Sequence, residues 1–297
     1  MKLQAENITK ICNGKRVLDH ISLTLEPGKI YGITGRIGVG KTTLFSILSG
    51  QAPADDGAVH LYNENGTLEE IFPGHICFPQ DLSLVIQEKG HQNQSMAEYF
   101  QELSRIYPNW DNDLANTLAA RFLFPPDKKL GDLSKGMMSM VTIICALSSK
   151  ADFTLLDEPE ACMDSLSREK FYHMLLEEFA DSGRTFLLAS HLLDELSELI
   201  DEVIFLDYDD KHTLDCGHIR LMENTRRLLS RSFLISGLQD KVDAAVQGYE
   251  AYDMGNFGRS KSMAVLLKDG QELPDSVDFT IRPLTLQKIF AALCSEE

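Results

Sequence analysis

A glycine-rich run that ends in lysine and threonine is the part of the sequence with the clearest chemistry. Gly35-Arg36-Ile37-Gly38-Val39-Gly40-Lys41-Thr42 fits the pattern G-x-x-x-x-G-K-[ST], and Thr43 follows it. The glycines let the backbone curl so that N–H groups point at phosphate oxygens, and a following helix adds its positive N-terminal end. Lys41 would then reach the β- and γ-phosphates of a nucleoside triphosphate, and Thr42 would offer its hydroxyl to Mg²⁺. The alternative is an ordinary glycine-rich turn with a surface lysine.

A second group of candidate residues follows two short apolar runs. Asp157 and Glu158 come directly after the run 153–156, and the run 186–190 ends at His191. Asp157 would help to hold Mg²⁺ through water, and Glu158 would orient or deprotonate the attacking water. His191 would contact the γ-phosphate. Each feature has a structural alternative, because paired acids often cap a helix and a lone histidine is usually structural.

The elements that position these residues follow from the apolar pattern. We expect helices over 41–49, ended by Gly50, over the face 171–179, ended by Gly183, and around 192–200. Strands are expected at 30–34, 153–156, 186–190 and 203–206. This alternation is typical of an α/β protein with a parallel sheet covered by helices.

Two regions interrupt the alternation. Residues 82–133 are polar and helix-rich, which predicts a helical insertion. After about Arg220 the chain has the character of a small α+β unit. Its expected strands lie at 233–235, 263–267 and 277–281, and an amphipathic helix at 286–293 follows them.

With these motifs in order, the sequence resembles the ATP-binding subunits of ABC transporters over about residues 2–220. Phe78-Pro79-Gln80 resembles the Q-loop, and Leu133-Ser134-Lys135-Gly136-Met137 stands where the family has its LSGGQ signature, 24 residues before Asp157. Leu155-Leu156-Asp157-Glu158-Pro159 is similar to Walker B, Met163-Asp164 to the D-loop, and His191 to the switch histidine.

The resemblance implies a fold, cofactors and partners. The fold is a P-loop ABC-ATPase core at 1–220, with a mainly parallel sheet, an antiparallel β part and a helical subdomain at about 82–135. A C-terminal α+β accessory domain would occupy 221–297. ATP and Mg²⁺ are the implied cofactors, with Thr42, Gln80 and Asp157 as metal ligands. Ser134 and Gly136 would bind the γ-phosphate of a second ABC ATPase subunit, identical or different.

The remaining implied partners are transmembrane permease subunits, which would hold the chain at the cytoplasmic face of the membrane. Gln80 and residues near Trp110 are candidates for the docking surface, although Trp110 is more simply a core aromatic. The signature and the segment 107–111 look most like the YtrB or bacitracin-exporter branch, which implies export of a peptide, an antibiotic or another amphipathic compound.

Three departures from the family pattern affect these expectations. Cys12 stands where an aromatic residue usually stacks on adenine, so Tyr31 or a partner would have to compensate. Lys135 replaces a signature glycine, and Cys162 replaces the D-loop glycine. Since Lys41 and Glu158 are retained, we still expect hydrolysis. The alternatives are a soluble non-transport ABC ATPase and a low-turnover regulatory or sensing subunit.

Composition excludes several classes of protein. The 297 residues include 28 Lys and Arg against 45 Asp and Glu, a net charge of −17. This acidity argues against nucleic acid or an anionic membrane surface as a bulk partner. No apolar stretch approaches the roughly 18 residues of a membrane helix. The six scattered cysteines lack metal-site spacing, so we expect a soluble protein of a reducing cytosol.

Overall fold

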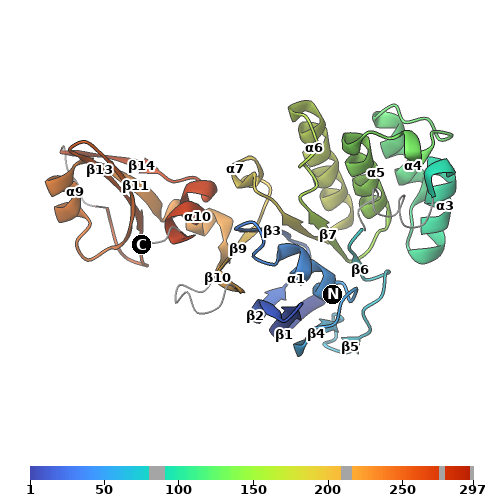
Figure 1. Ribbon diagram of the computed structural model, residues 1–297, viewed down its shortest axis with the longest axis horizontal. Coiled ribbons are helices and arrows are strands. Elements are labelled where there is room, and N and C mark those ends of the chain that lie inside the picture. The colour runs from blue at the N-terminus through green and yellow to red at the C-terminus, as the bar shows by residue number, and fades with distance from the viewer. Residues whose placement is uncertain (80–90, 209–215, 274–277, 295–297) are drawn as a thin grey trace.

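Two β-sheets organise the chain in a computed structural model, which describes residues 1–79, 91–208, 216–273 and 278–294 (Figure 1). The larger sheet has ten strands in the order β5-β4-β1-β2-β10-β9-β3-β8-β7-β6. Its strands are β1 (Lys2–Cys12), β2 (Lys15–Leu25), β3 (Ile30–Gly35), β4 (Asp56–Tyr62), β5 (Leu68–Glu69), β6 (Ile76–Cys77), β7 (Phe153–Asp157), β8 (Thr185–Ala189), β9 (Glu202–Tyr208) and β10 (Gly217–Asn224).

The parallel half of this sheet carries the candidate site. Strands β6, β7, β8, β3 and β9 are neighbours and run parallel, with β3 between β8 and β9. All six residues of β3 are buried, as expected for a strand covered on both faces. The strands predicted at 30–34, 153–156, 186–190 and 203–206 are thereby confirmed. The P-loop ABC-ATPase fold is confirmed with its antiparallel part, formed by β1, β2 and β4.

The helices that flank the parallel strands are α1 (Lys41–Leu48), α5 (Lys135–Ser148), α6 (Ser165–Ser182) and α7 (Leu193–Leu196). Helices α1 and α6 end as predicted, since Gly50 and Gly183 adopt φ of 74° and 62°. Helix α7 is shorter than expected from the apolar spacing. Beyond it the Leu199 N–H bonds to the Leu196 carbonyl at 2.8 Å, so a turn replaces the last helical residues.

The segment predicted to be a helical insertion contains helices throughout its described part, from residue 91 onward. These are η1 (His91–Asn93), α3 (Met96–Ile106), α4 (Asn112–Arg121) and η2 (Leu130–Asp132). Trp110 packs on Phe100 and Tyr107, with ring centroids 5.9 and 6.4 Å away. Its Nε1–H donates to Asn112 Oδ1 at 3.0 Å, so the core interpretation of this residue fits the structure better than a docking role.

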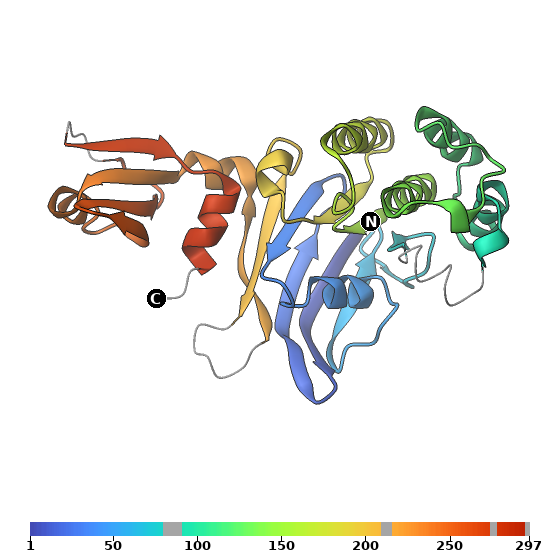
Figure 2. The same cartoon turned by 45° about the horizontal axis from the view of Figure 1, so that its top comes forward.

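The second sheet has four strands in the order β12-β13-β11-β14 and lies at one end of the molecule (Figures 1 and 2). Its elements are β11 (Ser232–Leu238), β12 (Glu250–Phe257), β13 (Ser260–Leu266) and β14 (Phe279–Pro283), with helices α8 (Thr225–Ser230), α9 (Gln239–Ala245) and α10 (Leu286–Cys294). Strand β12 was not expected from the sequence. Strand β10 belongs to the larger sheet and runs past residue 220, the predicted end of the nucleotide-binding core.

Helix α10 returns from the smaller sheet to the larger one (Figure 2). Phe290 packs edge-on against Phe205 of β9, with ring centroids 5.4 Å apart. Leu286, Ile289 and Leu293 join the buried cluster that also contains residues of α5 and α6. The C-terminal helix is therefore part of the main core.

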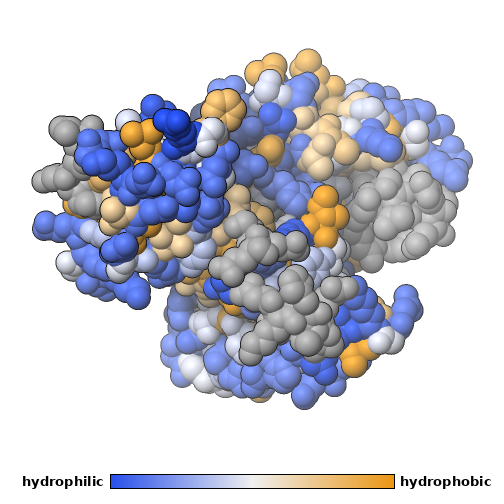
Figure 3. Space-filling view, turned by 60° about the vertical axis from the view of Figure 1, so that its left-hand side comes forward, coloured by the Kyte–Doolittle hydropathy of each residue, from blue (hydrophilic) through white to orange (hydrophobic). Residues whose placement is uncertain are grey.

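The surface agrees with the acidic composition. The face in Figure 3 is mostly hydrophilic, with apolar residues in small groups. Among the helices of the described residues, none is both long enough and apolar enough to cross a bilayer.

Candidate active site

The glycine-rich run forms the loop between β3 and α1, which we call the phosphate loop (residues 35–42). Gly38 and Gly40 have φ of 82° and 104°, a region that favours glycine. A Cβ at Gly40 would lie 2.6 Å from Leu18 Cδ2, and one at Gly35 would lie 2.5 Å from the Leu206 carbonyl oxygen. The tight curl therefore needs these glycines for two reasons, backbone conformation and close packing.

Lys41 lies inside this curl. Its side chain is buried, and its Nζ donates to the Gly35 carbonyl at 2.9 Å and to the Arg36 carbonyl at 3.4 Å. Burial lowers the pKa of Lys41, while the nearby carboxylates of Glu158 and Asp157 act in the opposite direction. No carboxylate of the described residues forms an ion pair with the ammonium, which leaves it available to a phosphate.

The carboxyl end of β7 meets the phosphate loop. The Thr42 hydroxyl donates to Asp157 Oδ2, so the two predicted metal ligands in the described residues lie together. Burial raises the pKa of Asp157, and the Thr42 hydrogen bond opposes that shift. A hydroxyl beside a carboxylate is a set of hard oxygen donors that suits Mg²⁺.

Glu158, which follows Asp157, faces His191. Glu158 Oε1 and His191 Nε2 are 2.7 Å apart, and both side chains are partly exposed. Glu158 adopts φ of 44°, unusual for a residue with a side chain, and its N–H bonds to the Ala189 carbonyl at 2.9 Å. The strand register that pairs Asp157 with Ala189 thus brings the acid after β7 and the histidine after β8 to one edge of the sheet.

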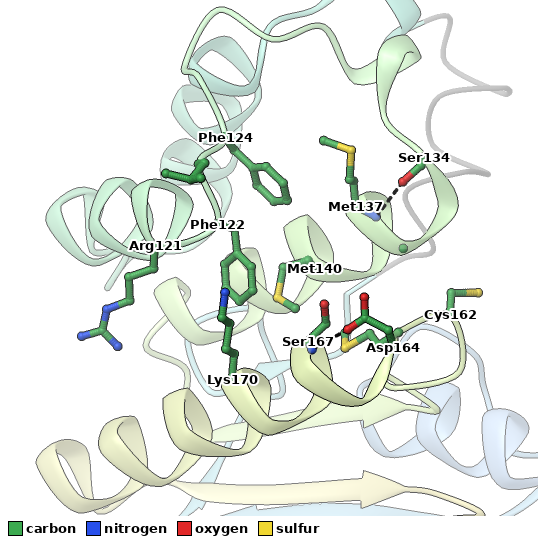
Figure 4. Close-up of a pocket in the computed structure, with 13 residues that line it drawn as sticks. Arg121, Phe122, Phe124, Ser134, Met137, Met140, Cys162, Asp164, Ser167 and Lys170 are labelled. Carbon is green, nitrogen blue, oxygen red and sulfur yellow. Dashed lines mark hydrogen bonds between the residues drawn. The ribbon is translucent and has the colours of Figure 1, made fainter.

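The signature residues form a separate group. Ser134 caps α5 by accepting the Met137 N–H at 3.3 Å, and a Cβ at Gly136 would lie 2.8 Å from the Cys162 carbonyl oxygen. A cavity of about 470 Å³ adjoins them (Figure 4). Its lining is drawn from α4, α5, α6 and the loops beside them, and it contains Ser134, Gly136, Cys162 and Asp164 but no described residue of the phosphate loop.

Three further expectations have different outcomes. Gln80 lies outside the described residues. Cys12 is exposed at the end of β1. The idea that Tyr31 compensates for it is wrong, because Tyr31 is fully buried within β3 and its hydroxyl accepts the Glu26 N–H at 2.8 Å. Its ring cannot reach a nucleotide without leaving the core.

Sequence reasoning missed the residues that brace the phosphate loop from β9. Arg36 Nε lies 3.1 Å from Asp207 Oδ1, and the Tyr208 hydroxyl donates to the Ile37 carbonyl at 3.1 Å. The Arg36 side chain is thus directed toward β9, although its backbone N–H belongs to the loop. The sequence did contain a signal, because Asp207 directly follows the apolar run 203–206. That run forms β9, the neighbour of β3, so its acid lies near the phosphate loop.

Comparison with known proteins places this geometry in a family. Residues 18–161 match the protein-family model described as ABC transporter. The chain contains an ABC transporter ATP-binding domain. The ABC transporter ATP-binding protein YtrB of Bacillus subtilis strain 168 is 27% identical over 211 residues, 69% of this chain and 68% of that protein.

Relatives of this ATP-binding domain include proteins named for import. The zinc uptake ATP-binding protein ZnuC of Bacillus subtilis strain 168 is 28% identical over 67% of this chain and 88% of that protein. The arabinose import ATP-binding protein AraG of Rhizobium johnstonii is 28% identical over 94% of this chain. The chain spans only about half of AraG, 54% of its length.

Solved structures share the fold of the ATP-binding domain. The ADP conformation of the cassette MJ1267 aligns with a TM-score of 0.56 and 22% identity, over 77% of this chain and 95% of that one. The dimeric post-hydrolysis cassette MJ0796 aligns with a TM-score of 0.58 and 21% identity, over 75% and 99%. The family match over residues 18–161 and the residues at the sheet edge both indicate an ABC-type ATPase.

Proposed function

We propose that this chain binds ATP with Mg²⁺ and hydrolyses it to power an ABC transporter. One observation carries the proposal: the pairs Thr42–Asp157 and Glu158–His191 lie at one edge of the sheet, beside a phosphate loop that buries Lys41. Peripheral attachment to the cytoplasmic face of the membrane, through permease subunits, follows from this role.

Each residue has a chemical task in this proposal. The phosphate-loop N–H groups and Lys41 bind the phosphates, with Thr43 in the first turn of α1. Thr42 and Asp157 would hold Mg²⁺, with Gln80 as a third ligand, and the ion would neutralise charge on the β- and γ-phosphates. Glu158 accepts a proton from the attacking water, and His191 orients the Glu158 carboxylate and contacts the γ-phosphate.

A second ATPase subunit completes the site. The signature residues Ser134 and Gly136 form a group apart from the phosphate loop, so they would act on the nucleotide of a partner subunit. The solved cassette MJ0796 is described as dimeric with ADP and Pi, which supports this arrangement. ATP would favour the closed pair, and hydrolysis would remove the contacts that hold it closed.

Export of a peptide, an antibiotic or another amphipathic compound is our proposal for the transported substrate. It is supported by the similarity to YtrB over two thirds of both chains. The relatives AraG and ZnuC favour import as the second candidate. Reconstitution with co-purified membrane subunits would separate the two, since export requires substrate to leave the side that carries the ATPase.

Replacing Glu158 tests the hydrolytic part of the proposal. Glu158→Gln keeps an oxygen that can accept from His191 but removes the base, so ATP turnover should fall by about 10²- to 10⁴-fold. Nucleotide binding should persist, and gel filtration should show an ATP-dependent dimer. Phosphate release would be measured with Mg²⁺ and with EDTA.

Glu177→Gln is the matched control, because Glu177 pairs with Arg121 on the exposed side of α6. Its turnover should equal that of the wild type. Turnover in Glu158→Gln that matches this control would reject Glu158 as the base. Absence of turnover in the wild type, even with its membrane partner, would reject the enzyme assignment.

A further inference from the structure

The last helix of the chain contacts the phosphate loop. The Arg36 guanidinium donates through Nη2 to the carbonyl oxygen of Cys294, the final residue of α10. The same guanidinium pairs with Asp207 of β9, whose carboxylate is almost completely buried. One side chain of the phosphate loop therefore joins the larger sheet to the C-terminal helix.

The other end of α10 contacts the segment that carries His191. The Gln287 N–H donates to Asp194 Oδ1 at 3.0 Å, and Asp194 lies in α7, three residues after His191. Between these two ends, Phe290 is anchored on Phe205. Helix α10 thus spans the two loops that would face the γ-phosphate.

The phosphate loop is otherwise braced from the same side. The Tyr208 hydroxyl bonds to the Ile37 carbonyl, and a Cβ at Gly217 would lie 2.1 Å from the Val39 carbonyl oxygen. Strands β9 and β10 therefore leave the backbone of the loop little room on this side. Through Arg36, a displacement of α10 would reach the loop.

We propose that α10 positions the phosphate loop for ATP through Arg36 and couples it to the segment that carries His191. Arg36 is then a positioning residue, which acts on ATP through the backbone of the phosphate loop. This inference rests on the proposed ATPase function. Because coupling is reciprocal, ATP binding must also change the stability of α10.

Hydrogen exchange on the full chain tests this reciprocity directly. With a non-hydrolysable ATP analogue and Mg²⁺, amide exchange should slow at residues 286–294 as well as at the phosphate loop. Protection of the phosphate loop without any change in α10 overturns the proposal. Absence of protection at the phosphate loop rejects the proposed function instead, so the two failures are distinguishable.

Arg36→Gln removes the charge and the forked donor. We expect the KM for ATP to rise about 3- to 10-fold, with a smaller change in kcat, and α10 exchange to become independent of nucleotide. Arg36→Lys keeps the charge beside Asp207 and should recover part of the lost affinity. A structural role alone would lower stability without uncoupling α10 from the nucleotide.

Arg227→Gln is the control, because Arg227 pairs with Asp269 on the exposed side of the C-terminal unit. Its KM and its exchange response should match the wild type. A KM in Arg36→Gln equal to that of this control overturns the proposal. Should Arg36→Gln fail to fold, the exchange experiment on the wild type still decides.

Discussion

Glu160 is a buried carboxyl group next to the residues proposed for hydrolysis. It accepts a hydrogen bond from the Ser190 hydroxyl through Oε1, while Oε2 has no hydrogen-bond partner within the described part of the chain. Burial raises the pKa of Glu160. The folded protein therefore holds the proton of this group more tightly than the unfolded chain does.

Glu160→Gln should consequently change how stability depends on pH. As pH rises from the ordinary glutamate value of 4.5 through the raised folded pKa, the wild type must ionise a buried group and loses stability. Glutamine stays neutral and can still accept from Ser190. The variant should be the more stable protein at pH 8, and the difference should vanish near pH 4.5. Urea unfolding across this range is the measurement, and a pH-independent difference would contradict the argument.

Gly40→Ala tests why the phosphate loop needs a glycine at that point. The substitution combines a strained φ, which alone costs about 1–3 kcal/mol, with a close contact to Leu18. The free energy of unfolding should therefore fall by more than the strain alone, and ATP binding should weaken at least tenfold. Gly66→Ala is the control, because Gly66 has φ of 75° with no atom within 4 Å of the added Cβ. Calorimetric titration and thermal unfolding report the two effects, and equal losses in both variants would show that backbone strain alone matters.

Residue types and spacing were sufficient to predict the five side chains that gather at the sheet edge. Lys41 and Thr42 belong to one motif, and Asp157, Glu158 and His191 follow apolar runs that had to be strands. The contacts of Arg36 were beyond reach, since Cys294 approaches it only after α10 has folded back onto β9. The role given to Tyr31 was wrong because the residue type alone does not show whether the ring of a strand tyrosine is buried or exposed.

At the level of elements, Arg184 joins α5, α6 and the parallel strands. Its guanidinium donates to the Leu147 carbonyl at 2.9 Å, the Ala151 carbonyl at 3.1 Å and Glu178 Oε1 at 2.8 Å. Glu178 also accepts from Lys150. Because Arg184 and Glu178 are both buried, each depends on the other for its charge.

Removing Arg184 should therefore be costly. We expect Arg184→Ala to lower the free energy of unfolding by about 3 kcal/mol, the low end for a broken buried pair, because Lys150 still contacts Glu178. Arg121→Ala breaks the exposed pair with Glu177 and should cost less than about 1 kcal/mol. Urea unfolding of both variants measures the difference, and similar losses would refute the role given to burial.

Elements with a continuous apolar run were easier to predict than elements with an alternating pattern. Strands β3, β7, β8 and β9 are buried along almost their whole length, and their sequences show it directly. Strand β1 mixes buried and exposed residues and is interrupted at Asn7, with φ of 52°. Its sequence is therefore too polar and irregular to predict a strand. Strand β12 has mostly exposed or half-buried residues, which leaves no periodic signal.

At the scale of the whole molecule, two exposed cysteines allow the two halves of the proposed site to be followed separately. Cys12 stands where the family resemblance implies a residue that stacks on adenine, and Cys162 lines the same cavity as the signature residues Ser134 and Gly136. The other four cysteines, all within the described residues, are buried. Thiol labelling can therefore follow nucleotide binding and assembly in the same chain.

The background for both measurements is Glu158→Gln. In a Cys12→Ser variant, ATP should slow the maleimide labelling of Cys162 several-fold, and only at protein concentrations that support the dimer. Cys12 measured in a Cys162→Ser variant should be protected by ATP at any protein concentration, because a single chain supplies that contact. Dilution series with a maleimide reagent give both rates. Protection of Cys162 that persists on dilution would contradict assembly as its cause.

The place of β3 in the sheet also has a consequence for synthesis of the chain. This strand is flanked by β8 and β9, so its backbone hydrogen bonds to these neighbours cannot form until residues 185–208 have left the ribosome. Until then this strand, whose six residues are all buried in the folded protein, has neither of its neighbours, which favours aggregation of the nascent chain and its binding by chaperones. The strand that delivers the phosphate loop is thus among the first to be made and among the last to be paired.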